Sequence, residues 1–308
     1  MNGAVIIDKP AGKTSHDIVQ QVKKILGAKK AGHTGTLDPM ATGVLPICLD
    51  EATKLAGFLA ANEKEYRAIM LLGVQTNTLD VTGKITATSN EMPEQKAIYG
   101  VINQMRGKMK QVPPAYSAVK HRGEPLYKWA RKGIFPDAAP REVEIFDIEV
   151  ENICLPQVTF RIACSKGTYV RVLCADIGEK LGCGASLYSL RRLRSGAFSE
   201  EMAISPERIK DELLRGFVPM EQLLPSLKAV EVESVFAEKL RNGLQPSIDM
   251  MRCYVHPFLG QGDMIKIIDS EKKLVALAQI TVAAGMLNKL DGNFPAARII
   301  RVFSAANR

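Results

Sequence analysis

A single carboxylate, Asp38, lies in a run of turn-forming residues at positions 32–45, GHTGTLDPMATGVL. Three glycines and one proline in these fourteen residues constrain the backbone, so the sequence predicts a tight, ordered loop. An aspartate that precedes a proline commonly caps nearby amides in a turn. The same side chain acts as a nucleophile on carbon if it is ionised, desolvated and oriented. Both roles are open for Asp38 on this pattern alone.

Arg171 is the second candidate, in the segment GTYVR at positions 167–171. A cation beside a carboxylate holds the carboxylate ionised. Arginine suits this task because its planar guanidinium grips a carboxylate with two hydrogen bonds and stays charged. Arg171 follows Val170, the first residue of an apolar stripe with helical spacing. We therefore expect it at the start of a helix, either directed into a cleft or exposed on the first turn.

Other side chains have ordinary structural explanations when each is taken alone. Tyr66 alternates with Ala68 and Met70, which is typical of the buried face of a strand. His33 is a single histidine in a loop, where solvation is a sufficient explanation. The segment KPAGKTS at 9–15 contains the Gly-Lys-Thr of phosphate-binding loops but lacks their earlier glycine, so it predicts no nucleotide site.

In their order along the chain, five segments resemble motifs of the TruB family of pseudouridine synthases. That family isomerises uridine 55 in the T-arm of transfer RNA. The similarity covers roughly residues 3–228. Thr36-Leu37-Asp38 agrees with TruB, whereas other pseudouridine synthase families have an arginine before the Leu-Asp pair.

The resemblance implies catalytic roles for three residues. Asp38 matches the aspartate that attacks the target nucleotide, at C6 of the base or at C1′ of the sugar. Arg171 matches the arginine that pairs with this aspartate. Tyr66 matches the tyrosine that stacks on the target base and assists removal of the proton from C5. Because nothing is oxidised and the aspartate supplies the covalent link, we expect no cofactor and no metal.

The resemblance also implies substrate-binding residues. Tyr169 matches the second active-site tyrosine, beside the arginine, and Leu190 matches an apolar residue that packs the base from below. An aromatic ring and a leucine make a suitable pocket for a flipped pyrimidine. His33 matches a residue that occupies the place vacated by the base or stacks on the neighbouring bases.

Three supporting residues complete the implied site. Lys9 and Pro10 belong to the family's first motif, which buttresses the catalytic loop. Asp80 lies in TNTLDVTG at 76–83, which resembles a family segment near the active site. We expect Asp80 to orient His33.

Composition agrees with an RNA-binding protein without requiring one. The chain has 308 residues, 41 Lys and Arg against 33 Asp and Glu, and a net charge of +8. A moderately basic protein suits a polyanionic partner, although an ordinary protein with a slight basic bias gives the same numbers. Basic residues and aromatic residues are interleaved at Lys29, Lys30, Lys108, Lys110, Tyr116, Lys120, His121, Arg122, Tyr127, Lys128, Trp129, Arg131, Lys132, Arg191, Arg192 and Arg194. Together they suit a stem-loop whose phosphates are gripped and whose bases are stacked.

The cysteines and the apolar segments indicate where the protein works. The six cysteines form no Cys-x-x-Cys pair and have no histidine at ligand spacing, which favours reduced thiols over disulfides or zinc. No window approaches 18 uncharged apolar residues, and the N-terminus lacks a charged leader with a long apolar core. We therefore expect a cytoplasmic protein with no contact with membranes.

The hydrophobic periodicity predicts an α+β fold. Ser15 is the expected cap of a helix that ends at Gly27, and a helical stretch is expected over 205–225. Further helices are predicted near 52–59, 98–105 and 170–181, and strands near 4–7, 66–72, 143–145 and 158–162. Strands and helices alternate irregularly, which argues against a doubly wound sheet. The resemblance implies a mixed, largely antiparallel sheet flanked by helices.

We expect two domains, with a boundary near residue 228. Residues 1–228 form the expected catalytic domain, with an RNA-clasping insertion at about 111–142. Residues 229–308 contain short β-rich runs separated by turns. They resemble the PUA module of bacterial TruB proteins, a small RNA-binding β-barrel, and a generic small barrel remains the alternative.

Two other functions remain open. One is a non-catalytic tRNA-binding protein or chaperone, and the other is a pseudouridine synthase subunit that depends on a guide RNA and partner proteins. The chain has only eight residues before Lys9 and no long basic tail, which favours the stand-alone bacterial type. We therefore expect a monomer that acts on the T-arm of tRNA without an obligatory protein partner.

Overall fold

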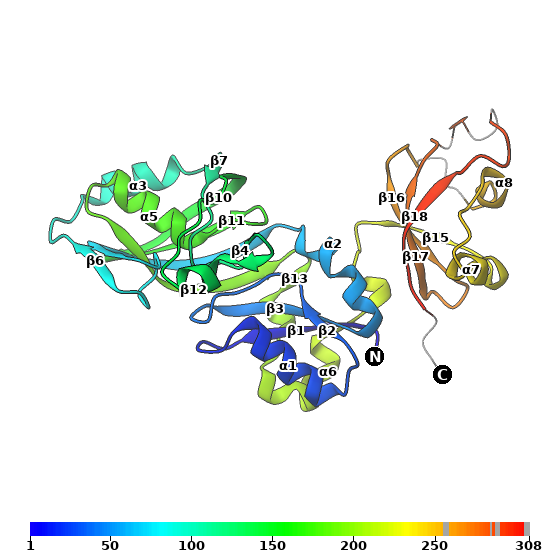
Figure 1. Ribbon diagram of the computed structural model, residues 1–308, viewed down its shortest axis with the longest axis horizontal. Helices are drawn as coiled ribbons and strands as arrows, with labels where there is room; N and C mark the ends of the chain where they lie inside the picture. Colours follow the sequence, from blue (N-terminus) through cyan, green and yellow to red (C-terminus); the bar gives the residue numbers. More distant parts are fainter. Residues whose placement is uncertain (255–258, 284, 287–289, 305–308) are drawn as a thin grey trace.

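The computed structural model describes residues 1–254, 259–283, 285–286 and 290–304. Figure 1 shows an elongated molecule in which a large sheet and its helices occupy one side and the C-terminal sheet the other. Helices and strands are mixed along the chain without a regular alternation. The α+β prediction is confirmed.

A single large sheet holds most of the chain together. Its strand order is β14-β1-β3-β12-β4-β11-β10-β7, with β2 paired to β3 and β13 paired to β12. Only the β12–β3 pair is parallel among these described strands. The sheet is therefore mixed and largely antiparallel, as predicted. Its strands are β1 (Gly3–Lys9), β2 (Ala31–His33), β3 (Thr42–Leu49), β4 (Lys64–Leu72), β7 (Gly107–Gln111), β10 (Arg141–Cys154), β11 (Gln157–Cys164), β12 (Ala185–Ser195), β13 (Phe198–Ser199) and β14 (Phe217–Pro219).

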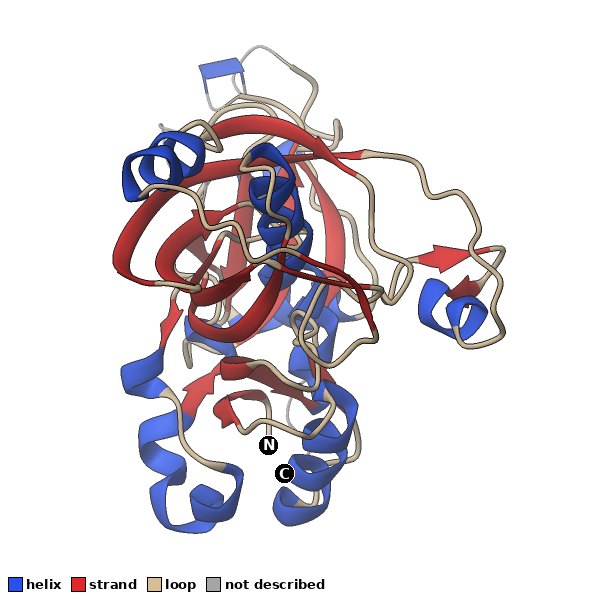
Figure 2. Ribbon diagram, turned by 90° about the vertical axis from the view of Figure 1, so that its left-hand side faces the viewer, coloured by secondary structure: helices blue, strands red, loops and turns tan. Residues whose placement is uncertain are grey.

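Helices accompany this sheet, and Figure 2 shows one within the curve of the strands and others beside and below it. They are α1 (Ser15–Leu26), α2 (Ala56–Ala60), α3 (Gln95–Asn103), α4 (Leu126–Ala130), α5 (Val170–Lys180) and α6 (Ile209–Gly216). Short 3-10 helices cover Asp50–Leu55, Glu200–Met202, Pro206–Arg208 and Met220–Gln222. The predicted helix near 52–59 is therefore half 3-10 helix, over 52–55, and half α-helix, over 56–59.

The first helix begins one residue earlier than expected. Thr14, not Ser15, is the N-cap: its hydroxyl accepts a hydrogen bond from the backbone of Asp17, whose carboxylate accepts one from the backbone of Thr14. Ser15 instead lies in the first turn and contacts the Asp38 loop through Leu37. Gly27 ends the helix in the left-handed conformation, as predicted.

The stretch 205–225 is not one helix. The helix α6 ends at Gly216, and the next three residues form β14, which pairs with the edge of β1. A side chain at Gly216 would lie 2.7 Å from Ile204, so the chain passes very close to its neighbour there. Pairing with β1 satisfies backbone groups that a longer helix would have left at an open sheet edge.

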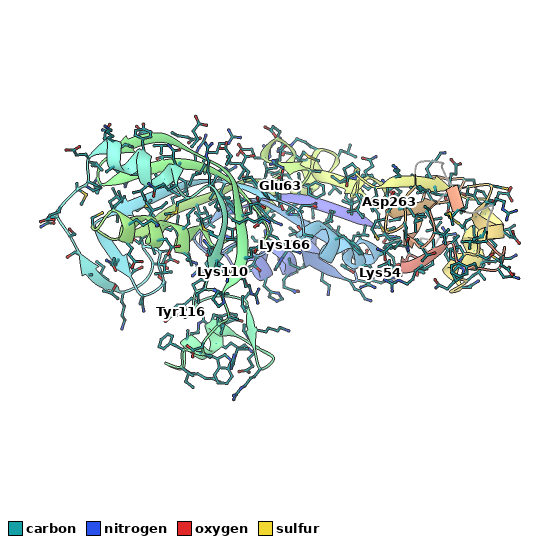
Figure 3. The ribbon with its side chains drawn as sticks, turned by 90° about the horizontal axis from the view of Figure 1, so that it is seen from above. Lys54, Glu63, Lys110, Tyr116, Lys166 and Asp263 are labelled. Carbon is teal, nitrogen blue, oxygen red and sulfur yellow. The ribbon has the colours of Figure 1, made fainter. Side chains whose placement is uncertain are left out.

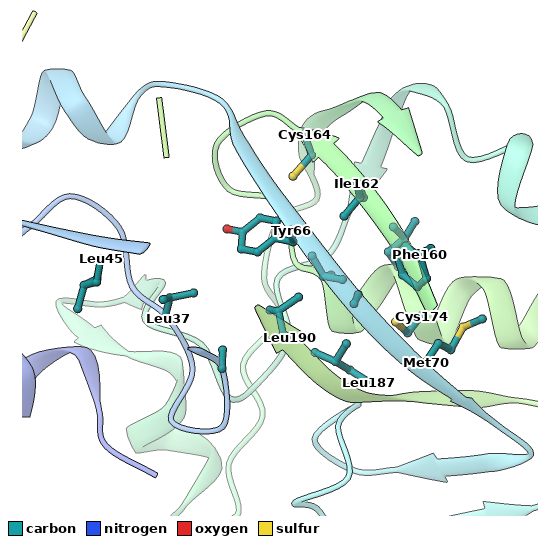
Figure 4. Close-up of a cluster of buried hydrophobic side chains, with 14 of the residues drawn as sticks. Leu37, Leu45, Tyr66, Met70, Phe160, Ile162, Cys164, Cys174, Leu187 and Leu190 are labelled. Carbon is teal, nitrogen blue, oxygen red and sulfur yellow. The ribbon is translucent and has the colours of Figure 1, made fainter. Parts of the chain in front are cut away.

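Alternation along the central strands builds the core next to the site. Tyr66, Ala68 and Met70 on β4 are buried on one face, as the sequence predicted. Phe160 on β11 and Leu187 on β12 pack with them. Figure 4 shows both gathered with Tyr66 and Met70 around the central strand. The face that carries Tyr66 is therefore fixed by the period-two pattern of a buried strand.

The predicted insertion connects two neighbouring strands. β7 ends at Gln111 and β10 begins at Arg141, so residues 112–140 leave the sheet and return to it. Within this segment, hereafter the insertion, β8 (Lys120–His121) pairs with β9 (Glu124–Pro125), followed by α4. Figure 3 shows the insertion projecting from the body of the molecule, with Tyr116 at its root. A second short hairpin, β5 (Val74–Thr76) and β6 (Ile85–Thr88), follows β4.

The C-terminal part begins with a strand at the predicted boundary. β15 (Lys228–Glu231), β16 (Met264–Ile268), β17 (Leu274–Ile280) and β18 (Ala297–Val302) form a four-stranded sheet in that order, with α7 (Ser234–Arg241) and α8 (Ile248–Met251). Leu277 and Phe303 pack with Ala4 and Val44 of the large sheet. The two sheets therefore share an apolar contact. Part of the predicted 229–308 domain lies outside the described residues, and closure into a barrel stays a prediction.

Candidate active site

The Asp38 loop connects β2 to β3 and is held from below by Lys9. The buried ammonium of Lys9 donates hydrogen bonds to the carbonyls of Pro10 (2.8 Å), Pro39 (3.1 Å) and Ala41 (2.7 Å). Two of these carbonyls lie just after Asp38, so Lys9 fixes the backbone that carries the carboxylate. The ammonium of Lys9 thus joins the carbonyl of Pro10 to the backbone of the Asp38 loop.

Lys9 is buried, and its direct hydrogen-bond partners are neutral carbonyl groups. Burial lowers the pKa of its ammonium from 10.5 to about 8, while the negative charge of Asp38 partly offsets this effect. The side chain therefore remains mostly protonated at neutral pH, with carbonyl oxygens as its direct hydrogen-bond partners.

Asp38 and Arg171 lie together although they are far apart in the sequence. Nη2 of Arg171 donates to Oδ1 of Asp38 over 3.0 Å. Arg171 is the second residue of α5 and is almost fully buried, whereas Asp38 is partly exposed. The guanidinium therefore lies behind the carboxylate, and the carboxylate faces outward. Of the two predicted orientations for Arg171, the structure has the one directed inward.

The geometry differs from the expected two-bond grip. A single hydrogen bond joins Arg171 to Asp38, because the same guanidinium also serves the carbonyl of Tyr116 at 2.8 Å and that of Thr78 at 3.4 Å. Its Nε is buried and has no hydrogen-bond partner. Arg171 thus connects three segments: the Asp38 loop, the insertion and the segment after β5.

The electrostatics of Asp38 reflect two opposing effects. Burial raises the pKa of its carboxyl group, and the Arg171 guanidinium lowers it. The nearby charge of Asp80 adds a smaller rise. Net desolvation makes the carboxylate a stronger nucleophile than one in bulk water, and Arg171 opposes its protonation.

A cavity of about 330 Å³ lies against this ion pair. Its lining includes Asp38, Arg171, Tyr66, Tyr169 and Leu190. The structure therefore brings to one cavity five of the six residues predicted to be catalytic or substrate-binding. Figure 4 shows the Tyr66 phenol directed toward the side where Leu37 and Leu45 lie, with Leu190 on the neighbouring strand.

Tyr169 is held at the N-terminus of α5 by the last residue of β7. The side-chain amide of Gln111 accepts from the backbone N–H of Tyr169 at 3.0 Å and donates to its carbonyl at 3.4 Å. The guanidinium of Arg171 lies 5.9 Å from the centre of the Tyr169 ring. The ring is thereby fixed next to the ion pair.

His33 and Asp80 do not form the expected pair. Among the described residues, no hydrogen bond or ion pair joins them. Asp80 accepts hydrogen bonds from Thr78 and Thr82 and lies 4.0 Å from Nη1 of Arg171, so its charge supports the arginine instead. His33 accepts from the backbone of Gly35 through Nδ1, and burial lowers the pKa of its imidazole. The neutral ring stands at the end of β2, before the loop.

Three residues near the site were not assigned to it from the sequence. Arg192 and Lys64 line the cavity and are buried, and Gln111 holds Tyr169. Alternation contained a usable signal, because Lys64 is two residues before Tyr66 and Arg192 two after Leu190. Their side chains could have been assigned to the same faces of β4 and β12.

Within the described residues, no group of three or more His, Cys, Asp or Glu side chains is arranged to hold a metal ion. None of the helices described here has the length and apolar character that a transmembrane span needs.

Comparison with known families decides the assignment. The model described as the TruB family pseudouridylate synthase N-terminal domain matches residues 23–170, and that of the tRNA pseudouridylate synthase B C-terminal domain matches residues 171–247. The chain belongs to the TruB family. It is accordingly a tRNA pseudouridine synthase, an isomerase, and Asp38 and Arg171 lie within the matched segments.

The similarity to other TruB proteins covers nearly the whole chain. The tRNA pseudouridine synthase B of Syntrophus aciditrophicus (strain SB) is 49% identical, over 98% of this chain and 99% of that protein. That of Geobacter sulfurreducens is 46% identical, over 99% of this chain and 100% of its own length. The TruB assignment therefore applies to the full length described here.

Solved structures with the same fold come from larger assemblies. A chain of a Cbf5-Nop10-Gar1 complex is 30% identical with a TM-score of 0.74, over 98% of this chain and 85% of that one. A chain of an H/ACA RNP bound to a substrate RNA containing 2′-deoxyuridine is 29% identical with a TM-score of 0.74, over the same shares of both chains. The fold of this chain is thus shared with a chain of a protein complex and with a chain of an RNA-bound RNP.

Proposed function

We propose that this protein converts uridine 55 in the T-arm of tRNA to pseudouridine, with Asp38 as the nucleophile. The observation that carries the proposal is the Asp38–Arg171 pair at a cavity also lined by Tyr66 and Leu190. A partly exposed carboxylate backed by a buried guanidinium is suited to attack carbon. The names of the similar proteins support a tRNA substrate. The choice of uridine 55 is what the resemblance of the motifs to those of the TruB family implies.

The reaction begins with binding of the T-arm through its phosphates. The target uridine then leaves its stack and enters the cavity, where Tyr66 covers one face of the base and Leu190 packs the other. Asp38 attacks C6 of the base or C1′ of the sugar. The glycosidic bond breaks, the uracil turns, and C5 bonds to C1′. Loss of the C5 proton completes the isomerisation, and no cofactor or metal is required.

Tyr169 and His33 serve RNA binding in this proposal. Tyr169 is fixed beside Arg171 and lines the cavity, so its ring is available to the flipped nucleotide. His33, at the end of β2, occupies the space that the flipped base leaves or stacks on neighbouring bases. A neutral imidazole is suited to stacking because it carries no charge to desolvate.

The domain organisation supports binding of a folded RNA. We assign residues 1–228 to catalysis, with the insertion at about 111–142 as an RNA clasp, and residues 229–308 to a PUA-like RNA-binding domain. The insertion projects beside the site (Figure 3) and touches it through the carbonyl of Tyr116, which accepts from Arg171. RNA held by the insertion would therefore lie next to Asp38.

We further infer that the protein acts alone, as a monomer in the cytoplasm. Similar proteins named tRNA pseudouridine synthase B match this chain over nearly their full lengths. The alternative is a guide-RNA-dependent subunit, which the similarity to the Cbf5 and H/ACA complexes favours. Activity of the purified chain on an unmodified tRNA transcript would decide between them, because a guide-dependent subunit would be inactive without its RNA.

The decisive experiment is mapping of pseudouridine in a tRNA transcript after incubation with the purified protein. Modification at position 55, together with tritium release from C5-labelled uridine, is expected for the wild type. Asp38→Asn should abolish both while retaining tRNA binding, because the amide is isosteric but not nucleophilic. Full tritium release by Asp38→Asn would refute the assigned nucleophile. Equal RNA binding with no modification by either protein would favour a tRNA chaperone.

A further inference from the structure

Arg192 is a buried cation whose hydrogen bonds hold both ends of the Asp38 loop. Its side chain is 1% exposed, and Nε donates to the carbonyl of Val44 over 2.6 Å while Nη2 donates to that of Gly35 over 3.1 Å. No carboxylate forms an ion pair with it in the described part of the chain. A buried guanidinium without a counter-ion is costly, so a structural role alone would be served more cheaply by a neutral side chain.

The sheet places Arg192 directly opposite Tyr66. The two residues are paired across β12 and β4, where side chains of opposed residues lie next to each other on one face. On its other side, Arg192 pairs with Gly43 of β3, and a side chain at Gly43 would lie 2.2 Å from the carbonyl of Arg192. The backbone of Arg192 is therefore held between β3 and β4, and its guanidinium is fixed by the hydrogen bonds to Val44 and Gly35. Both Arg192 and Tyr66 line the cavity.

Three ionisable groups face the Tyr66 phenol. Burial raises the pKa of Tyr66, whereas Arg192 on β12 lowers it through its charge and a hydrogen bond. Cys164 on β11 and Asp38 on the loop both raise it further. Burial raises the pKa of the Cys164 thiol to about 11, so this thiol is neutral at pH 7. Among these groups, only Arg192 opposes the rise.

We propose that Arg192 is a positioning residue for Tyr66: it holds the phenol oxygen toward the cavity, and its fixed charge favours the phenolate that removes the C5 proton. This inference rests on the proposed function, because it assigns a partner to the tyrosine of the last step. The same guanidinium holds Gly35 and Val44 on either side of Asp38. It thereby couples the position of the nucleophile to that of the base.

The proposed step is balanced in atoms and electrons. Tyr66 first loses its phenolic proton to solvent. The C5–H bond then breaks, its proton passes to the phenolate oxygen, and its electron pair forms the C5=C6 double bond. If Asp38 had been bound to C6, its carboxylate leaves with the C6–O electrons. If it had been bound to C1′, the C6=N1 pair moves to N1, which takes a proton from water.

The first experiment measures Tyr66 directly and needs no substrate. The protein is labelled with 3-fluorotyrosine, the Tyr66 resonance is assigned by its absence in Tyr66→Phe, and its chemical shift is followed against pH. Arg192→Gln is expected to move the Tyr66 titration to higher pH, and Arg192→Lys to restore part of the shift. Arg191→Gln is the matched control, since Arg191 on the same strand donates to Asp8 and Glu200 instead. A Tyr66 titration unchanged in Arg192→Gln would overturn the proposal.

The second experiment isolates the last chemical step. Turnover of tRNA containing uridine or 5-deuterouridine gives the isotope effect on C5 proton removal. Arg192→Lys should lower kcat by about 10-fold or more, as expected for a weakened general base, and should increase the isotope effect. A purely structural Arg192 would lower kcat and leave the isotope effect as in the wild type, which would refute the proposal. Because Arg192→Lys keeps a cation, it is the variant to use if Arg192→Gln does not fold.

A fluorinated substrate adds a test that separates this inference from the proposed function. With 5-fluorouridine at the target position, C5 has no proton to remove, so the steps before the last one proceed alone. Arg192→Lys should slow the processing of this RNA less than that of the uridine substrate, because only its effect on the Asp38 loop remains. Equal losses on both substrates would contradict the proposal. Failure of the wild type to modify any tRNA would refute the proposed function, while the Tyr66 titration would still test the contact.

Discussion

The guanidinium of Arg171 stands 3.0 Å from the carboxylate of Asp38, although 133 positions separate the two residues. The hydrogen bond between them joins the β2–β3 loop to the first turn of α5. The arginine is almost fully buried and the aspartate is partly exposed, so the charge of the cation acts on the carboxylate from the protein side. A carboxylate that is oriented from behind leaves its other oxygen free to face the cavity.

The first prediction concerns the pH dependence of this pair. The substitution Arg171→Met removes the cation that lowers the pKa of Asp38. The effect of burial is then less opposed, so the pKa of Asp38 should be higher than in the wild type. Because the ionised carboxylate is the reactive form, the acidic limb of kcat/KM should move to higher pH. Turnover at pH 7 should fall by about 100-fold or more, comparable to the loss of one preorganised charge partner. The measurement is tritium release between pH values of about 5 and 9. This range covers the pH at which a carboxyl group with a raised pKa loses its proton.

A matched control for this prediction is Arg67→Gln. Arg67 is also paired with a carboxylate, that of Glu151, but lies on the exposed face of β4. Its pH profile should match that of the wild type. An acidic limb that stays in place in Arg171→Met would show that the arginine does not control ionisation of Asp38.

The second prediction concerns the buried ammonium of Lys9. Lys9→Met leaves the carbonyls of Pro39 and Ala41 without their donor, which should destabilise the protein by about 1–3 kcal/mol and lower kcat. Binding of tRNA should change little, because Lys9 is buried below the loop. Urea unfolding and nitrocellulose filter binding measure the two effects. A normal kcat in a destabilised Lys9→Met would contradict the role of Lys9 in holding the loop.

The pH dependence of stability tests the ionisation of Lys9. Its pKa is about 8 in the folded protein and 10.5 in the unfolded reference, so between these values the unfolded chain binds the extra proton. Rising pH therefore favours the folded wild type in this window, and Lys9→Met lacks that gain. The free energy of unfolding of the wild type should therefore exceed that of Lys9→Met by an amount that grows from about pH 8 to about pH 10. If the free energies of unfolding of the wild type and Lys9→Met changed in parallel with pH, Lys9 would not have a lowered pKa in the folded protein.

The third prediction concerns the insertion. Lys128→Ala and Arg131→Ala should weaken tRNA binding and reduce the slope of log K against log salt concentration by about 0.7–0.9 for each phosphate that is no longer neutralised. The value of kcat should remain unchanged, since both residues lie outside the cavity lining. Lys210→Ala, at an exposed position on α6, is the control and should keep the wild-type slope. Equal slopes in all three variants would exclude the insertion from phosphate binding.

The fourth prediction concerns the core beneath the site. Phe160 on β11 is fully buried and pairs with Ala68, two residues after Tyr66. Phe160→Ala should lower the free energy of unfolding by about 3–5 kcal/mol, because it leaves a cavity in a close-packed interior. Phe146→Ala, at a half-exposed position on β10, should cost much less. Urea unfolding measures both, and similar losses would contradict the assigned packing.

The sequence alone determined those features that depend on local pattern. Turn residues around Asp38 required a loop, alternation at Tyr66, Ala68 and Met70 required a strand, and Gly27 ended the first helix. Each follows from the backbone preferences of a few consecutive residues. One error was the length of a helix: residues 217–219, expected to continue a helix, form a strand because the edge of β1 was available for pairing.

Only the tertiary structure decided which charged groups meet. Asp80 lies near Arg171 and not near His33, and a single hydrogen bond joins Arg171 to Asp38. Arg192 is paired with Tyr66 on the neighbouring strands β12 and β4. These contacts join segments that are distant in the sequence, and the sheet register and the burial of each side chain set them. The residue types set which charges these side chains can carry. Their distances from one another and their desolvation in the folded protein determine how strongly those charges interact.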